Sequence, residues 1–171
     1  DVTSLVKHRE AIKSAFRHHE GVDLTYLPFV IKAVVEALIE LPRLNATWGG
    51  DKIILKKRLN IGIAVVTPEG LMVPVVHEAD SLSVAGLARA CGNLTDRARR
   101  GKLALADVQN GTFTVNNTGA LGTIISKPII NFPQAAIMTS EAIQKRPVIV
   151  NDSIAIRSIM NLCLSFDHRI I

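Results

Sequence analysis

The stretch IAIRSIMNLCLSFDHRII, at positions 154–171, decides how the rest of the chain is interpreted. Its apolar side chains recur at every second position, which is the period of a β-strand with one buried face. They are Ile154, Ile156, Met160, Leu162, Leu164 and Phe166, and only Ser158 interrupts them. The pattern predicts one long strand whose apolar face lies in the core.

The tetrad Phe166-Asp167-His168-Arg169 follows at the tip of this predicted strand. A core strand is a rigid support, and residues at its tip can be held with the accuracy that proton transfer demands. His168 is therefore the first candidate for a catalytic residue. The alternative is a strand-end histidine with a structural role, which for an isolated histidine is favoured by about two to one.

Composition indicates a single globular domain. The chain has 171 residues, 48% of them hydrophobic, which suits one sizeable core. Its net charge of +5 comes with only 4% aromatic residues and no nucleic-acid-binding motif, so nucleic acid is not expected as a partner. No apolar run reaches the roughly 18 residues of a membrane span, so no membrane association is expected. Cys91 and Cys163 lack metal-ligand spacing; we interpret them as reduced core thiols and expect no metal.

Three stretches have the periodicity of helices. They are an amphipathic stretch over residues 3–20, a largely apolar one that Thr25 caps and Pro42 ends, and a third over residues 84–102, for which Asp80 or Ser81 is the expected start signal. The third ends in a basic cluster, Arg97, Arg99, Arg100 and Lys102. These cations either form a phosphate site or complement the negative pole of the helix, and the second interpretation is favoured by about three to one.

Strands are expected between and after these helices. Residues 59–66 and 71–76 flank a turn, Thr67-Pro68-Glu69-Gly70, and both are expected to be central strands of a sheet. Pro74 is an exception to this pattern, because proline lacks a ladder donor. Further strands are predicted at residues 53–55, from 111 toward 119, 136–143 and 148–150. Hairpins mixed with crossing helices predict an α/β two-layer sandwich, in which helices cover a mixed β-sheet.

Asp167-His168-Arg169, at the end of such a strand, resembles the signature Asp-His-Arg-x-x-Asp-Gly of the dihydrolipoamide acyltransferases, the core components of 2-oxo acid dehydrogenase complexes. Other segments resemble the same family in order and spacing: IGIAV at 61–65 with GLMVPV at 70–75, GTFTVNNTG at 111–119, and PIINFPQAAI at 128–137. The resemblance implies a chloramphenicol acetyltransferase-like fold, that of the CoA-dependent acyltransferases.

The segment at 111–119 departs from the family pattern at one position. The family has a serine, which supplies a hydroxyl to the reaction centre, where this chain has Asn116. An amide NH₂ can also donate to an oxyanion. Without the resemblance, Asn116-Asn117-Thr118-Gly119 is ordinary turn chemistry.

The resemblance implies transfer of an acyl group from a dihydrolipoyl arm to coenzyme A. His168 would be the general base and Asn116 the oxyanion donor, while Asn117, Thr118 and Gly119 would bind substrate. Coenzyme A would be a substrate, and the lipoyl group would be carried on a domain outside this chain. Asn-Asn-Thr-Gly and the segment 161–165 most resemble bacterial branched-chain members rather than acetyl or succinyl ones.

The resemblance also implies an assembly. Family members form homotrimers that build a 24-mer or 60-mer core, with the decarboxylase and dihydrolipoamide dehydrogenase components as partners, in the bacterial cytoplasm or the mitochondrial matrix. We expect residues 1–171 to be one acyltransferase catalytic domain, without lipoyl or peripheral-subunit-binding domains. We also expect truncation at the C-terminus, since the second Asp of the signature would fall just beyond Ile171, and at the N-terminus, since the chain begins abruptly with Asp1.

Two other functions remain open from the sequence. One is a non-catalytic assembly core, which would keep the sheet and the trimer contacts without turnover. The other is a CoA-dependent acetyltransferase of the antibiotic type, acting on a small hydroxyl or amine acceptor. Those enzymes carry His-His at the strand end, so Asp167-His168 favours the dihydrolipoamide acyltransferases over them.

Overall fold

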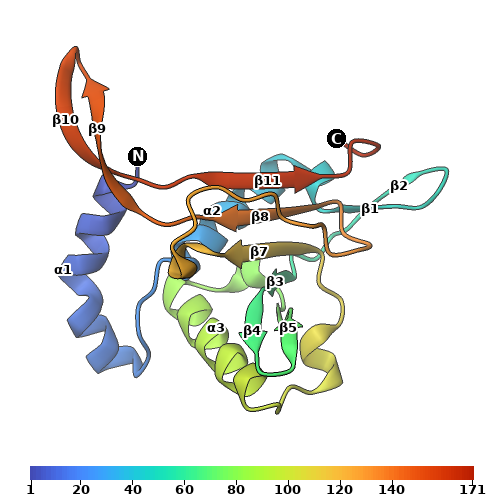
Figure 1. Ribbon diagram of the computed structural model, residues 1–171. Coiled ribbons are helices and arrows are strands. Elements are labelled where there is room, and N and C mark those ends of the chain that lie inside the picture. The colour runs from blue at the N-terminus through green and yellow to red at the C-terminus, as the bar shows by residue number, and fades with distance from the viewer.

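A five-stranded mixed sheet forms the centre of the computed structural model, which describes residues 1–171 (Figure 1). Its strands lie in the order β11-β8-β7-β3-β6, with bounds Leu162–Phe166, Ala136–Ser140, Phe113–Asn117, Ile61–Ile63 and Val75–Val76. β7 is parallel to both of its neighbours, whereas the edge strands β11 and β6 run antiparallel to theirs. The predicted mixed sheet is therefore confirmed.

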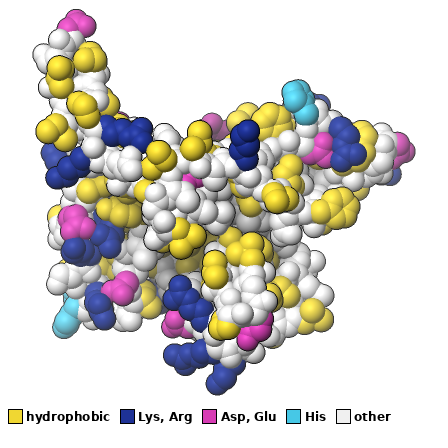
Figure 2. Space-filling model, viewed as in Figure 1, with side chains coloured by type: hydrophobic (Ala, Val, Ile, Leu, Met, Phe, Trp, Pro, Cys, Tyr) yellow, Lys and Arg dark blue, Asp and Glu magenta, His cyan; other side chains and the backbone are white.

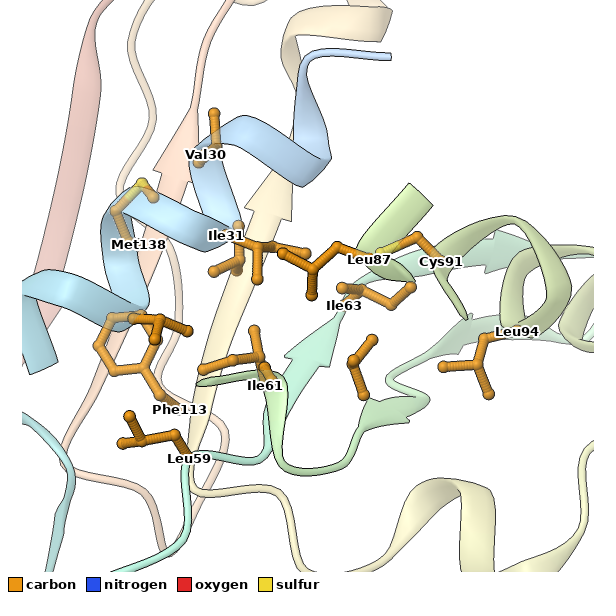
Figure 3. Close-up of a cluster of buried hydrophobic side chains, with 14 of the residues drawn as sticks. Val30, Ile31, Leu59, Ile61, Ile63, Leu87, Cys91, Leu94, Phe113 and Met138 are labelled. Carbon is orange, nitrogen blue, oxygen red and sulfur yellow. The ribbon is translucent and has the colours of Figure 1, made fainter. Parts of the chain in front are cut away.

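Two helices, α2 (Leu27–Glu40) and α3 (Val84–Arg99), pack on one face of this sheet. Figure 3 shows Ile31 of α2 and Leu87 of α3 pointing toward Ile61 and Ile63 of β3. All four side chains are at most 1% exposed. Burial of such side chains from two layers is the main stabilising contribution of the fold.

The cap residues of both helices differ from the sequence prediction. α2 begins after Tyr26 without a side-chain cap, so Thr25 does not cap it, although Pro28 lies in the first turn as expected. α3 is capped by Ser83, whose Oγ accepts a hydrogen bond from the Gly86 N–H at 3.1 Å. The expected caps of α3, Asp80 and Ser81, instead belong to a separate 3-10 turn, Ala79–Ser81, and the extended backbone of Leu82 prevents that turn from continuing into the helix.

α1 (Thr3–Glu20) has the predicted bounds, but none of its side chains is fully buried. It lies beside the ribbon of β9 (Gln144–Val150) and β10 (Ser153–Ile159), away from the main sheet (Figure 1). The Val2 N–H donates to the Ser158 carbonyl at 2.8 Å, which fixes the start of α1 to β10.

The expected pair of central strands at residues 59–66 and 71–76 is wrong in its outer half. β4 (Val65–Thr67) and β5 (Gly70–Met72) form a separate two-stranded hairpin, with Val66 66% and Leu71 64% exposed. Pro74 marks the change between β5 and β6, because its carbonyl accepts from the Ile63 N–H at 2.8 Å while it has no N–H to return.

The expected single strand over residues 154–166 is also wrong. β10 pairs with β9 in the ribbon, and β11 pairs with β8 in the main sheet, with Met160 and Asn161 between them. The apolar set predicted to be buried is largely exposed: Ile154, Ile156, Leu162, Leu164 and Phe166 are 39–78% exposed. The helices do not cover this edge of the sheet, so the strand period is correct but the apolar face has no cover within one chain.

A smaller hairpin, β1 (Ala46–Trp48) with β2 (Ile53–Leu55), lies near the end of β11. The strand predicted at residues 53–55 is confirmed as β2. Ala46 of this hairpin forms a second small core with Ala135 and Ile170. None of the helices in the structure combines the length and apolar character needed to cross a bilayer.

Candidate active site

His168 lies in a turn that follows β11 directly and is exposed to solvent. The turn is fixed to the start of β8, because the Asp167 N–H donates to the Ala135 carbonyl at 2.8 Å. It closes on itself through the Ile170 N–H, which donates to the Asp167 carbonyl at 2.9 Å. The His168 ring contacts Phe166, with 5.6 Å between the ring centroids.

Asp167 and Arg169 hold each other across His168. The Arg169 Nη2 donates to Asp167 Oδ2 at 2.6 Å, and its Nε donates to Oδ1 at 2.9 Å. The Arg169 backbone N–H adds a third bond to Oδ1, at 3.0 Å. These side-chain and backbone hydrogen bonds lower the pKa of Asp167 to about 2. Asp167 is therefore ionised at neutral pH and constrains the turn that presents His168.

The other side of the turn rests on the β1–β2 hairpin. The Arg169 guanidinium lies 5.4 Å from the centroid of the Trp48 ring, within the range of a cation–π contact. Ile170 is only 2% exposed and packs against Ala46 and Ala135. The sequence did not reveal this role of Trp48, because nothing in its local pattern indicates which distant residue it meets.

A shallow cavity of about 380 Å³ opens beside His168. Its wall combines the histidine turn with the segment that precedes β8, and its lining residues are Ile130, Phe132, Gln134, Phe166, Asp167, His168 and Arg169. Phe132 is 89% exposed and forms part of the rim. The cavity is therefore open to solvent at this rim.

Asn116 and Asn117 are the last two residues of β7, paired with Thr139 and Ser140 of β8. The side chain of Asn116 is half-buried and that of Asn117 is exposed. Asn116 belongs to the face of the sheet opposite the helices, because Val115, its neighbour, lies in the helix-covered core.

Thr118 and Gly119 make contacts within the chain. The Thr118 hydroxyl donates to Glu141 Oε2 at 2.9 Å. A Cβ at Gly119 would lie 2.5 Å from the Glu141 carbonyl oxygen, so only glycine fits against this backbone. Glu141 itself was not singled out from the sequence, in which one glutamate after a strand carries no recognisable signal.

The sheet places His168 and Asn116 far apart within one chain. Asn116 and Cys163 both pair with Thr139, and the strand then continues from Cys163 to Phe166 before it reaches the histidine turn. Standard strand spacings separate the Cα atoms of Asn116 and Phe166 by roughly 14 Å, and His168 lies farther still. One copy of the chain therefore cannot bring the two side chains to the same reacting atom.

One residue of the basic cluster at the end of α3 takes part in an ion pair. Arg97 forms an ion pair with Asp107, which also accepts from the Ala104 N–H at 2.6 Å. This contact fixes the 3-10 turn Leu105–Val108 against the helix end. For Arg97 the structure thus shows a contact within the chain, whereas the proposed complementation of the helix dipole stays a prediction.

The whole chain, residues 1–171, matches the family described as 2-oxoacid dehydrogenases acyltransferase (catalytic domain). It is 51% identical, over 172 residues, to the lipoamide acyltransferase component of the branched-chain alpha-keto acid dehydrogenase complex of Bacillus subtilis. The match covers 100% of this chain but 41% of that relative, so the chain spans about two fifths of its length.

Solved structures show the same fold. A probable dihydrolipoamide acetyltransferase from Listeria monocytogenes superposes with a TM-score of 0.98 at 53% identity, over 100% of this chain and 73% of that one. The dihydrolipoamide acetyltransferase of Azotobacter vinelandii, studied for the catalytic role of a serine, a histidine and an asparagine, gives 0.97 at 37%, over 100% and 71%. A chloramphenicol acetyltransferase, at 12% identity and a TM-score of 0.53 over 86% and 70%, shares the fold alone.

Proposed function

Since the chain belongs to the family of 2-oxoacid dehydrogenase acyltransferase catalytic domains, we propose that it transfers an acyl group from a dihydrolipoyl arm to coenzyme A. The thiol of coenzyme A, with an ordinary thiol pKa near 8.5, must lose its proton before it attacks the thioester near neutral pH. An imidazole, with an ordinary pKa near 6.5, is suited to accept that proton. We assign His168 as this base. Its exposure beside an open cavity, on a turn that backbone hydrogen bonds hold in place, supports the assignment.

Asn116 is the proposed oxyanion donor. Attack of the thiolate on the acyl carbonyl forms a tetrahedral intermediate with a negative oxygen, and one aimed donor in such a site contributes roughly 3 to 4 kcal/mol. The carbon–sulfur bond to the dihydrolipoyl arm then breaks, and the leaving thiolate takes the proton from His168. In the Azotobacter vinelandii enzyme, the serine and histidine named for catalysis are separated by as many residues as Asn116 and His168 are here.

The observation that carries the proposal further is the separation of these two residues within one chain. Because a single copy cannot join them, a complete site requires His168 from one copy and Asn116 from a neighbour. In a closed ring of copies joined head to tail, every interface forms one such site. We propose the homotrimer, because a two-fold dimer has an isologous interface and three copies are the smallest head-to-tail ring.

The exposed apolar surface supports this self-association. It follows the outer strand β11 and the β9–β10 ribbon, and the hydrophobic side chains on the projecting ribbon are visible in Figure 2. Its most exposed members are Ile149, Ile154 and Ile156 of the ribbon and Leu162 of β11, and Ile129 and Phe132 are further exposed apolar residues in the segment before β8. Large apolar side chains that gather on a protein surface are typical of protein interfaces. We assign these residues to contacts between copies in the core of a bacterial cytoplasmic complex, with decarboxylase and dihydrolipoamide dehydrogenase partners.

Mixed assembly tests the two-copy site. His168→Ala and Asn116→Ala chains are each expected to be nearly inactive alone. Random co-assembly in equal amounts should restore about a quarter of the wild-type rate, because one site in four then receives both intact residues across a head-to-tail interface. Acyl transfer from acyl-dihydrolipoamide to coenzyme A is measured, and mass spectrometry verifies mixing. Mixed oligomers without recovered activity contradict the two-copy site.

The acyl group is proposed to be branched-chain, on the strength of the similarity to the Bacillus subtilis component. Isobutyryl-, acetyl- and succinyl-dihydrolipoamide are compared as donors by kcat/KM in the same assay. The highest kcat/KM with the isobutyryl donor supports the assignment, whereas a preference for another donor replaces it. Transfer to a hydroxyl or amine acceptor in place of coenzyme A would favour the antibiotic-type reaction.

A further inference from the structure

Glu141 is a buried carboxylate whose hydrogen-bond partners are all neutral. It follows β8 directly, is 2% exposed and takes part in none of the ion pairs of the structure. Its Oε2 accepts from Thr118 at 2.9 Å and from Thr123, and its Oε1 accepts from Ser126 at 2.5 Å. Three hydroxyls from one segment of chain therefore converge on one carboxylate.

These hydrogen bonds keep the carboxylate ionised. Burial on its own would raise the pKa of Glu141, but the bonds from Ser126, Thr123, Thr118 and the Cys163 thiol outweigh it and hold the pKa below its usual value. Hydrogen bonds to the charged form have this effect because each partially compensates for the lost water. A neutral side chain at position 141 could not accept from all of these groups with equal strength.

The backbone around Glu141 holds the same segment. The Ala142 N–H donates to the Thr123 carbonyl at 2.8 Å, and the Asn161 side chain donates to the Ile124 carbonyl at 2.5 Å. Gly119 lies against the Glu141 backbone, where no larger residue fits. We call residues 118–126 the clamped segment.

The clamped segment has little apolar anchorage of its own. Leu121 is 73% and Ile125 is 74% exposed, and none of its residues is buried. Its position therefore depends on the polar contacts to Glu141 and to the adjoining backbone. Such a segment is expected to loosen as a unit when its central acceptor is removed.

The clamped segment starts immediately after Asn116 and Asn117. The Ser140 hydroxyl donates to the Asn116 carbonyl at 3.4 Å, so the residue before Glu141 also contacts the proposed oxyanion donor. We propose that Glu141 is a positioning residue of the acyl-transfer site, which holds the clamped segment and thereby fixes the direction of the Asn116 side chain. This inference rests on the proposed role of Asn116.

A positioning role has a distinct kinetic signature. Misplacement of a donor by about 1 Å can cost up to about a hundredfold in rate, because the donor acts on charge that develops in the transition state. Binding of coenzyme A in the ground state should change much less. Glu141→Gln, which keeps the shape but exchanges one acceptor oxygen for a donor NH₂, is therefore expected to lower kcat roughly tenfold to a hundredfold with little change in KM.

The test uses Glu141→Gln, Asn116→Ala and the double variant in the assembled enzyme, with kcat and the KM for coenzyme A as readouts. If Glu141 acts through Asn116, Glu141→Gln lowers kcat in the wild-type background and adds almost nothing in the Asn116→Ala background. Amide hydrogen exchange in residues 118–126 should become faster in Glu141→Gln. Asp107→Asn serves as the matched control, since Asp107 is a carboxylate that fixes another turn, and its kcat should equal that of wild type.

The outcomes separate the inference from the proposed function. Unchanged kcat in Glu141→Gln, or equal losses of kcat in both backgrounds, overturns the positioning role. Exchange in residues 118–126 that is as slow as in wild type overturns the clamp itself. Full activity of Asn116→Ala, by contrast, overturns the proposed role of Asn116 as donor, and with it the proposed action of Glu141 through Asn116.

Discussion

The Arg169 guanidinium lies 5.4 Å from the centroid of the Trp48 ring and at the same time binds Asp167. Trp48 is the single tryptophan of the chain. Because Arg169 and Asp167 flank His168, we expect the indole fluorescence of Trp48 to respond to changes in the turn that presents the candidate base. This coupling makes the state of the turn measurable without an activity assay.

Acid should loosen the histidine turn in a defined pH window. Arg169 lowers the pKa of Asp167 from an ordinary value of 3.8 to about 2. A carboxylate with a lowered pKa stabilises the folded turn above its ordinary pKa, and the stabilisation is lost as pH falls toward its lowered pKa. Trp48 emission is therefore expected to change between about pH 4 and pH 2. Asp167→Asn should remove this transition, whereas Asp51→Asn, in the β1–β2 turn, should retain it; identical titrations of all three proteins would contradict the coupling.

Replacement of His168 by Ala should abolish most acyl transfer. Removal of a general base typically lowers kcat by about 100- to 10,000-fold. The oligomer should remain intact, as measured by light scattering after size exclusion, because His168 is exposed and its turn is held by its neighbours. His77→Ala, an exposed histidine bound to the Ala106 carbonyl, is the control and should keep the wild-type rate. Loss of the oligomer at an unchanged rate per assembled site would show that His168 is structural.

Substitutions at Asn116 should separate a donor from a turn residue. Asn116→Ala is expected to slow the chemical step by roughly a hundredfold or more, without comparable weakening of coenzyme A binding. Asn116→Ser should retain much of the rate, since a hydroxyl restores the donor that the family carries there. Single-turnover kinetics measure the step directly. A rise in KM alone, or no change, would move the donor to Thr114, Thr118 or a backbone amide.

Truncation of a side chain in α2 should lower the free energy of unfolding more when that side chain is buried in the helix-covered core. Ile31 is 0% exposed and Ile39 is 59% exposed on the same helix. Ile31→Ala should lower the free energy of unfolding by about 2 to 5 kcal/mol, and Ile39→Ala by about 0.5 kcal/mol or less. Urea titrations of the two variants make the comparison, and similar midpoints would place the core elsewhere.

A charge on the outer strand β11 should disrupt self-association while leaving the chain folded. Leu164 is 46% exposed, so lysine fits there in a single copy, but an apolar contact with a neighbouring copy would bury the charge at a cost of several kcal/mol. Leu164→Lys is expected to elute as a smaller species with an unchanged circular dichroism spectrum. Leu105→Lys, at a leucine that is 70% exposed away from β11, should elute as wild type. An unchanged oligomer in Leu164→Lys would exclude β11 from the interface.

Local secondary structure could be predicted from the sequence more readily than the burial of each apolar face by other elements. The bounds of α1 and β2 were correct because helical and strand periods are local properties. The strand period at residues 154–166 was also correct, yet the strand breaks at Met160 and its apolar face is exposed, because burial depends on elements distant in the chain and on other copies. The contact of Trp48 with Arg169 is invisible for the same reason. The proposed roles of His168 and Asn116 stay predictions, whereas their separation across the sheet is a property of topology that no local pattern carries.

The antiparallel course of β11 beside β8 predicts that the specific activity depends on the protein concentration. Each separate chain holds the proposed base at one end of its sheet and the proposed donor at the other. With the proposed two-copy site, an isolated chain is therefore expected to be inactive. Specific activity should therefore fall on dilution below the dissociation constant of the oligomer, and the initial rate should rise more steeply than linearly with protein concentration in that range. Unassembled chains would leave acyl thioesters untouched.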